Sequence, residues 1–184
     1  MPALEPPEPP LTDGVVALRG VREADADQVV AALRDPDIVR WTRVPAGYTH
    51  EDFAAYLHAS HAAMCAGTTL SLLVVDADDH EHVLGSCGLH ELDSERADIG
   101  YWVARGARGR GVAPRATALM RDHATGTLGL PRVEVLVHPD NVPSQRVAEK
   151  AGFARTGELR PSPRRDDHEP RPELVVFAYL PPAR

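Results

Sequence analysis

The residues with the clearest chemical potential form a short loop of glycines and arginines. The run Arg108-Gly109-Arg110-Gly111-Val112-Ala113 follows a segment that predicts a strand and precedes one with helical spacing. Glycines let the backbone approach a ligand closely, and the start of the next helix offers unpaired amide groups and a partial positive charge. Arg108, Arg110 and Arg115 add full charges. This combination predicts a cradle for an anion such as phosphate.

Two common phosphate-binding loops do not fit this run. A Walker loop needs a Gly-Lys-Ser/Thr sequence, and the single lysine of the chain, Lys150, lies elsewhere. A dinucleotide-binding loop needs a third glycine where Pro114 stands. The predicted strand meander in front of the loop, in place of a βαβ unit, also opposes a Rossmann fold.

Other clusters suggest metal binding only weakly. His58, His61 and Cys65 have the spacing i, i+3, i+7 on one face of a predicted helix and could ligate zinc. They lack a fourth ligand, so we favour a structural role. The acidic and histidine-rich segment 76–82 is expected to be a solvated turn, and Cys87 is expected to pack in the interior. We therefore expect no metal and activity that needs none.

Composition and charge exclude several classes of protein. The chain has 184 residues, which suits one domain. Its formal net charge of −7 argues against bulk nucleic-acid binding. Two cysteines cannot build a disulfide framework, no segment approaches the ~18 apolar residues of a membrane span, and the start of the chain lacks the features of a signal peptide. We expect a cytoplasmic protein with neither nucleic acid nor membrane as a partner.

Hydrophobic periodicity predicts the elements that position the loop. Proline-rich residues 1–13 are expected to form a disordered tail, and residues 14–184 a single domain. The first predicted elements are a strand over 15–18, a helix that Pro36 ends and a helix capped by Thr49. The later elements are a three-strand meander over 70–75, 83–89 and 97–103, a helix from 112, a strand over 133–137, a helix capped by Asn141, and strands over 153–159 and 174–180.

The loop and two later segments resemble a known family. The run 108–113 matches the Arg/Gln-x-x-Gly-x-Gly/Ala signature of the GNAT superfamily of acyl-CoA-dependent N-acetyltransferases. Residues 98–103 resemble the fourth strand of that family. Residues 138–144 and 150–153 resemble the later motif of the ribosomal-protein alanine N-acetyltransferases. The resemblance covers nearly the whole chain after the tail. It implies an α+β single domain, with a mixed, mostly antiparallel, splayed sheet and helices on both faces.

The resemblance also implies roles for individual residues. Acetyl-CoA would be the co-substrate, with its pyrophosphate held by the backbone of residues 108–113 and its pantetheine arm filling the gap between the splayed strands. Asn141 would hydrogen-bond the pantetheine arm, and Ser144 would protonate or hydrogen-bond the leaving thiolate. An amide near Trp102 or Val103 would stabilise the oxyanion. Plain roles for Asn141 as a helix cap and for Ser144 as a first-turn serine remain open.

The general base is open between Glu91, His90 and Asp98. Glu158 stands nearest to a glutamate proposed as base in some relatives, but its offset differs and we do not carry that role over. An α-amine with a pKa of ~7.8 is about one-seventh neutral at pH 7, whereas a lysine at ~10.4 is neutral in about one molecule in 2,500. An enzyme that acts on an α-amine therefore needs less help from a base.

Three functions are compatible with these residues. The first is acetylation of a protein N-terminus by direct attack in a ternary complex. The others are acetylation of a small amine, such as an aminoglycoside, polyamine or metabolite, and a non-catalytic acyl-CoA sensor. The resemblance places the acceptor groove along residues 35–48, the helix from Glu51 and residues 160–172. Those segments carry Trp41, Tyr48, Phe53, Tyr56, Asp166, Asp167 and Glu169. A monomer or a homodimer is expected.

Overall fold

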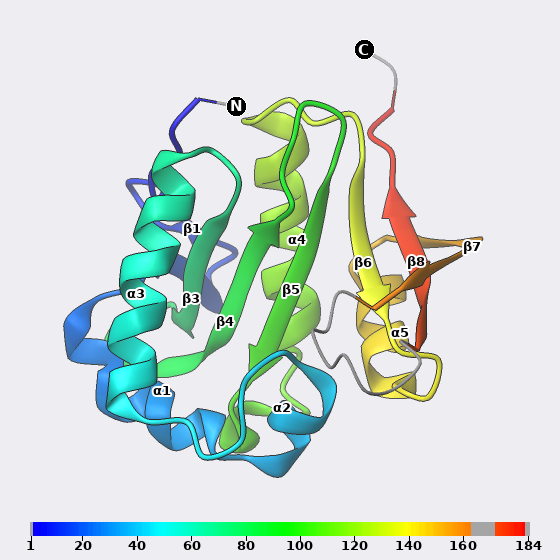
Figure 1. Ribbon diagram of the computed structural model, residues 1–184. Helices are drawn as coiled ribbons and strands as arrows, with labels where there is room; N and C mark the ends of the chain where they lie inside the picture. The colour runs from blue at the N-terminus through cyan, green and yellow to red at the C-terminus, as the bar shows by residue number, and fades with distance from the viewer. Residues whose placement is uncertain (1, 163–171, 183–184) are drawn as a thin grey trace.

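The computed structural model of the chain describes residues 2–162 and 172–182 (Figure 1). Eight strands and five α-helices follow one another, with short 3₁₀ turns over Glu23–Asp25 and Arg105–Ala107. In chain order the elements are β1 (Leu11–Thr12), β2 (Val16–Gly20), α1 (Ala26–Leu33), α2 (Pro36–Trp41), α3 (His50–Cys65), β3 (Leu70–Asp76), β4 (Val83–His90), β5 (Ala97–Val103), α4 (Val112–Gly126), β6 (Val133–Val137), α5 (Val142–Lys150), β7 (Ala154–Pro161) and β8 (Glu173–Tyr179).

The strands form one open sheet in the order β1-β2-β3-β4-β5-β6-β8-β7. Among the described strands β5 and β6 are the parallel pair, and every other neighbouring pair is antiparallel. The predicted mixed, mostly antiparallel sheet is confirmed. The meander β3–β4–β5 precedes the glycine-arginine loop, as the periodicity indicated.

β5 and β6 pair over only two residues. Only Ala97 with Val133 and Asp98 with Glu134 are in register, and the strands then diverge. The remainder of β5, from Ile99 to Val103, pairs with β4 on one side and has no partner among the described strands on the other. The predicted splay is therefore present, and it opens the sheet in its middle.

Helices cover both faces of the sheet (Figure 1). On one face α4 and α5 pack on Leu70, Leu72, Val74 and their neighbours, with Met120 completely buried in the interface. On the other face α1, α2 and α3 enclose a second core that contains Leu73 and Val75 from β3. Because side chains alternate along a strand, β3 supplies both cores from seven residues.

Local signals explain where the helices near the gap begin. Thr49 accepts a hydrogen bond from the amide of Asp52, whose carboxylate binds the amide of Thr49, so a capping box starts α3. The side chain of Asn141 accepts from the amide of Ser144 and starts α5. Gly111 precedes α4 in the left-handed conformation, with φ of 80°. Each of these starts coincides with a predicted helix start.

One prediction about the first part of the chain is incomplete and another is wrong. The predicted helix ends before Pro36, at Leu33, but Pro36 itself occupies the first position of a further short helix, α2, where its missing amide costs nothing and which Asp35 caps. Residues 1–13 were expected to form a disordered tail, whereas Leu4 is buried, its amide donates to the carbonyl of Met64, and Leu11–Thr12 pairs with β2. One buried leucine and a two-residue strand attach this proline-rich segment to the domain.

None of the helices in the described part of the chain combines the length and the hydropathy that crossing a membrane requires.

Candidate active site

A cleft of about 1350 Å³ passes through the sheet where β5 and β6 separate. It brings together eleven of the twelve residues that the sequence predicted for the site: Glu91, Asp98, Trp102, Val103, Arg108, Gly109, Gly111, Val112, Ala113, Asn141 and Ser144. The twelfth, Arg110, is exposed and lies outside the cleft lining. One continuous cavity therefore connects the loop, the divergent strand and the start of α5.

The glycine-arginine loop takes the shape of an anion cradle. Gly109 and Gly111 have φ values of 75° and 80°, a region that residues with a Cβ rarely adopt. A Cβ added to Gly111 would meet only Arg115 Nε, at 3.8 Å, so this glycine is required for its conformation and not for lack of space. Val112 and Ala113, at the start of α4, line the same cleft as the loop glycines. Backbone groups of residues 108–113 can therefore hold a pyrophosphate.

The three arginines of the loop are not equivalent. The guanidinium of Arg108 donates to Asp35 (2.9 Å) and Asp37 (3.1 Å) at the start of α2, and to the carbonyl of Val103 (3.2 Å). Arg115 pairs with Asp13 at 2.6 Å. Arg110 has no ion pair with any other described residue. Arg110 is thus the side chain of the three whose charge is available to an anionic ligand.

Helix α2 forms part of the wall of the cleft and is held at both ends. Arg108 binds its first residues, and Trp41 at its other end lies against His138, with ring centroids 5.4 Å apart. His138 follows β6, so this contact spans the gap between the two halves of the sheet. The position of α2 is therefore coupled both to the loop and to the far strand.

Tyr101 and Ser144 meet across the gap with their hydroxyl oxygens 2.7 Å apart. Tyr101 comes from the unpaired part of β5 and Ser144 from the first turn of α5. Burial raises the pKa of Tyr101 to about 12, so the phenol keeps its proton at neutral pH. A phenol is a better donor than an aliphatic alcohol, which leaves the proton of Ser144 free to point elsewhere. Sequence reasoning missed the Tyr101 hydroxyl because its partner lies 43 positions away.

Asn141 acts as a helix cap in this structure. Its side-chain oxygen accepts from the amide of Ser144 at 3.2 Å, which fixes the orientation of the first turn of α5. The cap leaves the amide nitrogen of Asn141, which lines the cleft, unused. Both roles considered from the sequence, helix cap and donor to a ligand, are therefore compatible with one conformation.

The register of β5 distinguishes between the two predicted oxyanion donors. Ala104 donates to the carbonyl of Leu84 on β4, and amides alternate in direction along an antiparallel strand. The amide of Trp102 is then directed at β4, whereas that of Val103 faces the gap. The Val103 carbonyl also faces the gap, where it binds Arg108. Of the two amides, that of Val103 is therefore the one that faces the gap, and Trp102 also lines the cleft.

The three candidate bases lie together on the α1–α3 side of the sheet. Asp98 and His90 are cross-strand partners on β5 and β4, and Glu91 follows His90. Glu91 has φ of 48°, the only non-glycine residue in the described ranges with a positive φ. Such strain is concentrated at functional sites. Tyr101 lies three residues after Asp98, so its side chain is on the opposite face of β5, where it packs against the core under α4. The candidate bases and the Tyr101–Ser144 pair are therefore on opposite faces of this strand.

Burial perturbs the acid–base groups in opposite directions. It raises the pKa of Asp98 to about 6, and Glu134 and Glu91 add to this effect while Arg96 and Arg160 oppose it. Burial, with Arg43 nearby, lowers the pKa of His90 to about 4. At neutral pH His90 is therefore neutral and a weak base, whereas Asp98 is mostly ionised and can accept a proton. Between these two groups the electrostatics favour Asp98 as the base.

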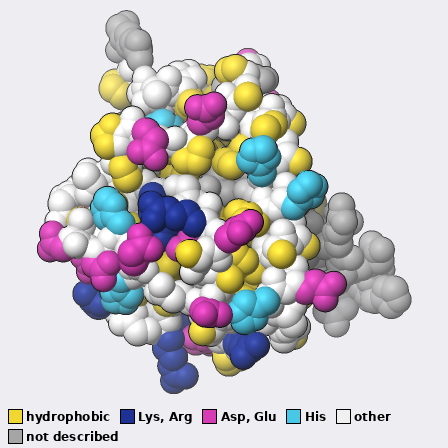
Figure 2. Space-filling model, turned by 90° about the vertical axis from the view of Figure 1, so that its left-hand side faces the viewer, with side chains coloured by type: hydrophobic (Ala, Val, Ile, Leu, Met, Phe, Trp, Pro, Cys, Tyr) yellow, Lys and Arg dark blue, Asp and Glu magenta, His cyan; other side chains and the backbone are white. Residues whose placement is uncertain are grey.

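The proposed metal ligands on α3 do not form a site. His61 Nδ1 and Cys65 Sγ are 3.9 Å apart, and no group of three potential ligands occurs among the described residues. His58 and His61 instead line a second crevice of about 640 Å³ beside α3. Figure 2 shows this side of the molecule, where hydrophobic side chains are visible between acidic and histidine side chains.

The acceptor side of the cleft is only partly described. Trp41, Tyr48, Phe53 and Tyr56 line it as expected. Ser162 and Pro172 also line it and are joined by a backbone hydrogen bond of 2.9 Å. Asp166, Asp167 and Glu169, which the sequence assigned to this groove, lie outside the described residues.

Comparison with known proteins agrees with this geometry. Residues 16–154 match the family model of the acetyltransferase (GNAT) domain. The chain belongs to the GNAT acetyltransferase family. This GNAT member is therefore an N-acetyltransferase, with acetyl-CoA as its co-substrate and an amine as its acceptor, and its fold and its family agree with the resemblance seen in the sequence.

Individual relatives span different acceptors. The chain is 28% identical over 169 residues to the uncharacterized N-acetyltransferase p20 of Bacillus licheniformis, covering 90% of each chain. Its fold is similar to that of ribosomal-protein-S5-alanine acetyltransferase from Vibrio fischeri, with a TM-score of 0.75, 16% identity and coverage of 90% and 92%. It is also similar to that of spermidine N-acetyltransferase from Vibrio cholerae in complex with CoA and spermine, with a TM-score of 0.74, 15% identity and coverage of 91% and 96%.

The cradle can be tested at Gly111. Gly111→Val forces a β-branched residue into the left-handed region, at a cost of about 1–3 kcal/mol, or the loop changes shape. We expect acetyl-CoA affinity to fall by about tenfold or more, since ~1.4 kcal/mol corresponds to tenfold, as measured by calorimetry. Gly106→Val is the matched control, because Gly106 has no positive φ and a Cβ there meets nothing within 4 Å. Equal affinity in the two variants would contradict the cradle.

The link from Arg108 to α2 predicts a second effect. Arg108→Gln breaks the contacts to Asp35 and Asp37 while the loop backbone remains, so the acceptor KM should rise by about three- to tenfold, in line with ~1 kcal/mol for a partly exposed ion-pair network. Acetyl-CoA affinity should change less. Arg110→Gln removes the same charge without touching α2 and should show the reverse pattern. A rise in acceptor KM in both variants would exclude the link as its cause.

Proposed function

We propose that this acetyltransferase transfers acetyl to the α-amino group of a protein N-terminus, by direct attack in a ternary complex in the cytoplasm. The observation that carries the proposal is the position of Asp98, with a pKa of about 6, in the same cleft as the Tyr101–Ser144 pair and the cofactor loop. The proposal assigns the base to Asp98, the proton donor to Ser144 and the oxyanion donor to the amide of Val103.

The basicity of Asp98 matches an α-amine better than a lysine or a polyamine. Moving a proton from an α-ammonium with a pKa of ~7.8 to a carboxylate with a pKa of about 6 costs about 2.5 kcal/mol. From a lysine-like ammonium at ~10.4 the same transfer costs about 6 kcal/mol. The neighbouring His90, with a pKa of about 4, is a weaker base than Asp98 and does not reduce this cost. This difference favours the more acidic ammonium group.

The residues support a simple sequence of bond changes. Asp98, directly or through a water molecule, takes a proton from the ammonium group, and the neutral nitrogen forms a bond to the carbonyl carbon of the acetyl group. The oxygen gains charge and is stabilised by the amide of Val103. The carbon–sulfur bond then breaks as the carbonyl re-forms, and Ser144 gives its proton to the thiolate. Tyr101 donates to Ser144 and can replace that proton. The nitrogen loses its second proton to solvent, which leaves the neutral amide.

Acceptor choice is the direct test of the proposed function. We expect peptides with a free α-amine to be acetylated with kcat/KM about 100-fold or more above that of the same peptides blocked at the N-terminus and carrying a lysine, because the neutral fractions differ by that order. Spermidine and an aminoglycoside complete the panel, with release of free CoA as the readout. Preferred turnover of spermidine or of the blocked, lysine-containing peptide would contradict the proposed acceptor.

The Tyr101–Ser144 pair predicts a shared contribution to thiol release. Ser144→Ala should lower kcat by about tenfold, near or below the lower end of the range for positioned acid catalysis, with acetyl-CoA affinity within about threefold. Tyr101→Phe should lower kcat in the same direction, and the double variant should be little worse than Ser144→Ala, because the two groups act as a unit. Additive losses would show independent roles. Pre-steady-state kinetics must establish that chemistry limits the rate.

A further inference from the structure

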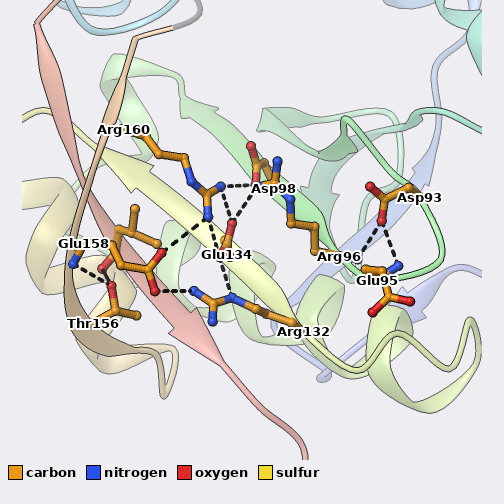
Figure 3. A network of polar contacts seen from close by, with 10 residues as sticks. Asp93, Glu95, Arg96, Asp98, Arg132, Glu134, Thr156, Glu158 and Arg160 are labelled. Carbon is orange, nitrogen blue, oxygen red and sulfur yellow. Dashed lines mark hydrogen bonds and ion pairs between the residues drawn. The ribbon is translucent and has the colours of Figure 1, made fainter.

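Glu134 on β6 is a completely buried carboxylate held by three arginines (Figure 3). Arg96 donates to Oε2 at 2.9 Å, and Arg132 donates to Oε1 at 2.5 Å. Arg160 donates to both oxygens, at 2.5 and 2.9 Å. Each carboxylate oxygen therefore accepts two charge-assisted hydrogen bonds, which is close to the full capacity of the group.

This cluster lies at the point where the sheet opens. Glu134 and Asp98 form the second and last registered pair of β6 and β5, so their side chains lie on the same face. Arg96 comes from the turn before β5 and Arg160 from the end of β7, two residues before Ser162 of the cleft wall. Glu134 thus connects three segments that meet beside the proposed base.

Asp98 receives little from the same arginines. Its Oδ1 is 3.6 Å from Arg96 Nη1 and 3.9 Å from Arg160 Nη1, which is too far for a hydrogen bond. That oxygen is buried and has no hydrogen-bond partner in the described ranges. The donors that could reach Asp98 are directed at Glu134, whose pKa falls to about 2 because the hydrogen bonds from Arg160, Arg132 and Arg96 outweigh the effect of burial.

We propose that Glu134 is a positioning residue that engages Arg96 and Arg160 and so keeps the Asp98 carboxylate free of a direct hydrogen bond from either arginine. A carboxylate in direct hydrogen-bonded contact with arginine is a weak base, and Glu134 prevents that contact by competing for the donors. The inference rests on the proposed function only in assigning to Asp98 the proton of the amine.

The other titratable groups around Asp98 do not engage Arg96 and Arg160 in place of Glu134. Glu91 at the end of β4 is a like charge that also raises the proton affinity of Asp98. His90, its cross-strand partner, is neutral at working pH. The two positive charges beside Asp98 are those of Arg96 and Arg160, and both are bound to Glu134. Removing the charge of Glu134 therefore changes the partners of both.

The test is Glu134→Gln in the full chain. An amide carries no charge and accepts fewer hydrogen bonds, so Arg96 and Arg160 should turn to Asp98 and lower its pKa by about one unit or more. Titration of the Asp98 carboxyl carbon by NMR measures this directly. Because the base must be ionised, activity is lost as the pH falls through that pKa, and the acid limb of kcat/KM should move to lower pH by the same amount. The plateau should also fall, since the base is weaker.

Glu158→Gln is the matched control. Glu158 pairs with the same Arg132 and Arg160, at 3.1 and 3.6 Å, but it is half-exposed and is not among the groups that perturb Asp98. Its replacement should leave the Asp98 pKa and the acid limb where they are. Glu134→Asp keeps the charge and should shift both less than Glu134→Gln does. Thermal unfolding establishes that each variant is folded. If Glu134→Gln does not fold, the Asp98 pKa is compared in Glu134→Asp and Arg160→Gln instead.

The outcomes separate the two claims. An unchanged Asp98 pKa in folded Glu134→Gln, or an equal shift in Glu158→Gln, overturns the role of Glu134 and leaves it as a structural ion cluster. A lowered Asp98 pKa with an unmoved acid limb supports the role of Glu134 and instead removes Asp98 as the base of the proposed function. A parallel fall in both supports the two together.

Discussion

The early separation of β5 from β6 is the constraint on which the rest of the structure depends. An interrupted sheet exposes main-chain groups that would otherwise be paired, and such groups are costly to bury unless a ligand or a side chain satisfies them. Here Arg108 satisfies the carbonyl of Val103, and the amide of the same residue faces the gap. The opening is therefore both a structural cost and the means by which the fold places polar main-chain groups in a cleft through the sheet.

Three contacts keep the gap open to a defined extent. At the closed end, Glu134 and its arginines join β5, β6 and β7. Across the gap, the hydroxyls of Tyr101 and Ser144 meet, and on the α1–α3 side Trp41 lies against His138. Each contact joins the two halves of the sheet through side chains instead of backbone ladders. A side chain can change its hydrogen-bond partner when a ligand enters. The backbone hydrogen bonds of paired strands cannot be exchanged one at a time in this way.

Sequence reasoning predicted the features whose signals are local. The glycine-arginine loop, the caps at Thr49 and Asn141 and the strand meander all depend on residues within a few positions of one another, and the structure places them as expected. The end of α1 before Pro36 was predicted, but the start of α2 at Pro36 was missed because proline both stops a helix and favours the first turn of the next one. The buried role of Leu4 depends on Met64, sixty positions away.

The remaining features depend on contacts that a single sequence does not display. Glu134 alternates with Val133 and Val135, a pattern that ordinarily directs a charged residue to solvent. Burial follows because Arg96, Arg132 and Arg160 close over it. The preference for Asp98 over His90 likewise required the charges that surround Asp98, which come from four different strands or turns.

The left-handed backbone of Glu91 has a consequence for attempts to improve the enzyme. A glutamate there costs about 1 kcal/mol relative to a residue suited to that conformation, such as glycine or asparagine. Selection of variants for thermal tolerance alone would therefore favour loss of a carboxylate from the wall of the cleft. At this position a residue that suits the backbone conformation would remove the negative charge that Glu91 brings to the cleft. A stabilised variant that keeps its activity is therefore expected to gain its stability elsewhere.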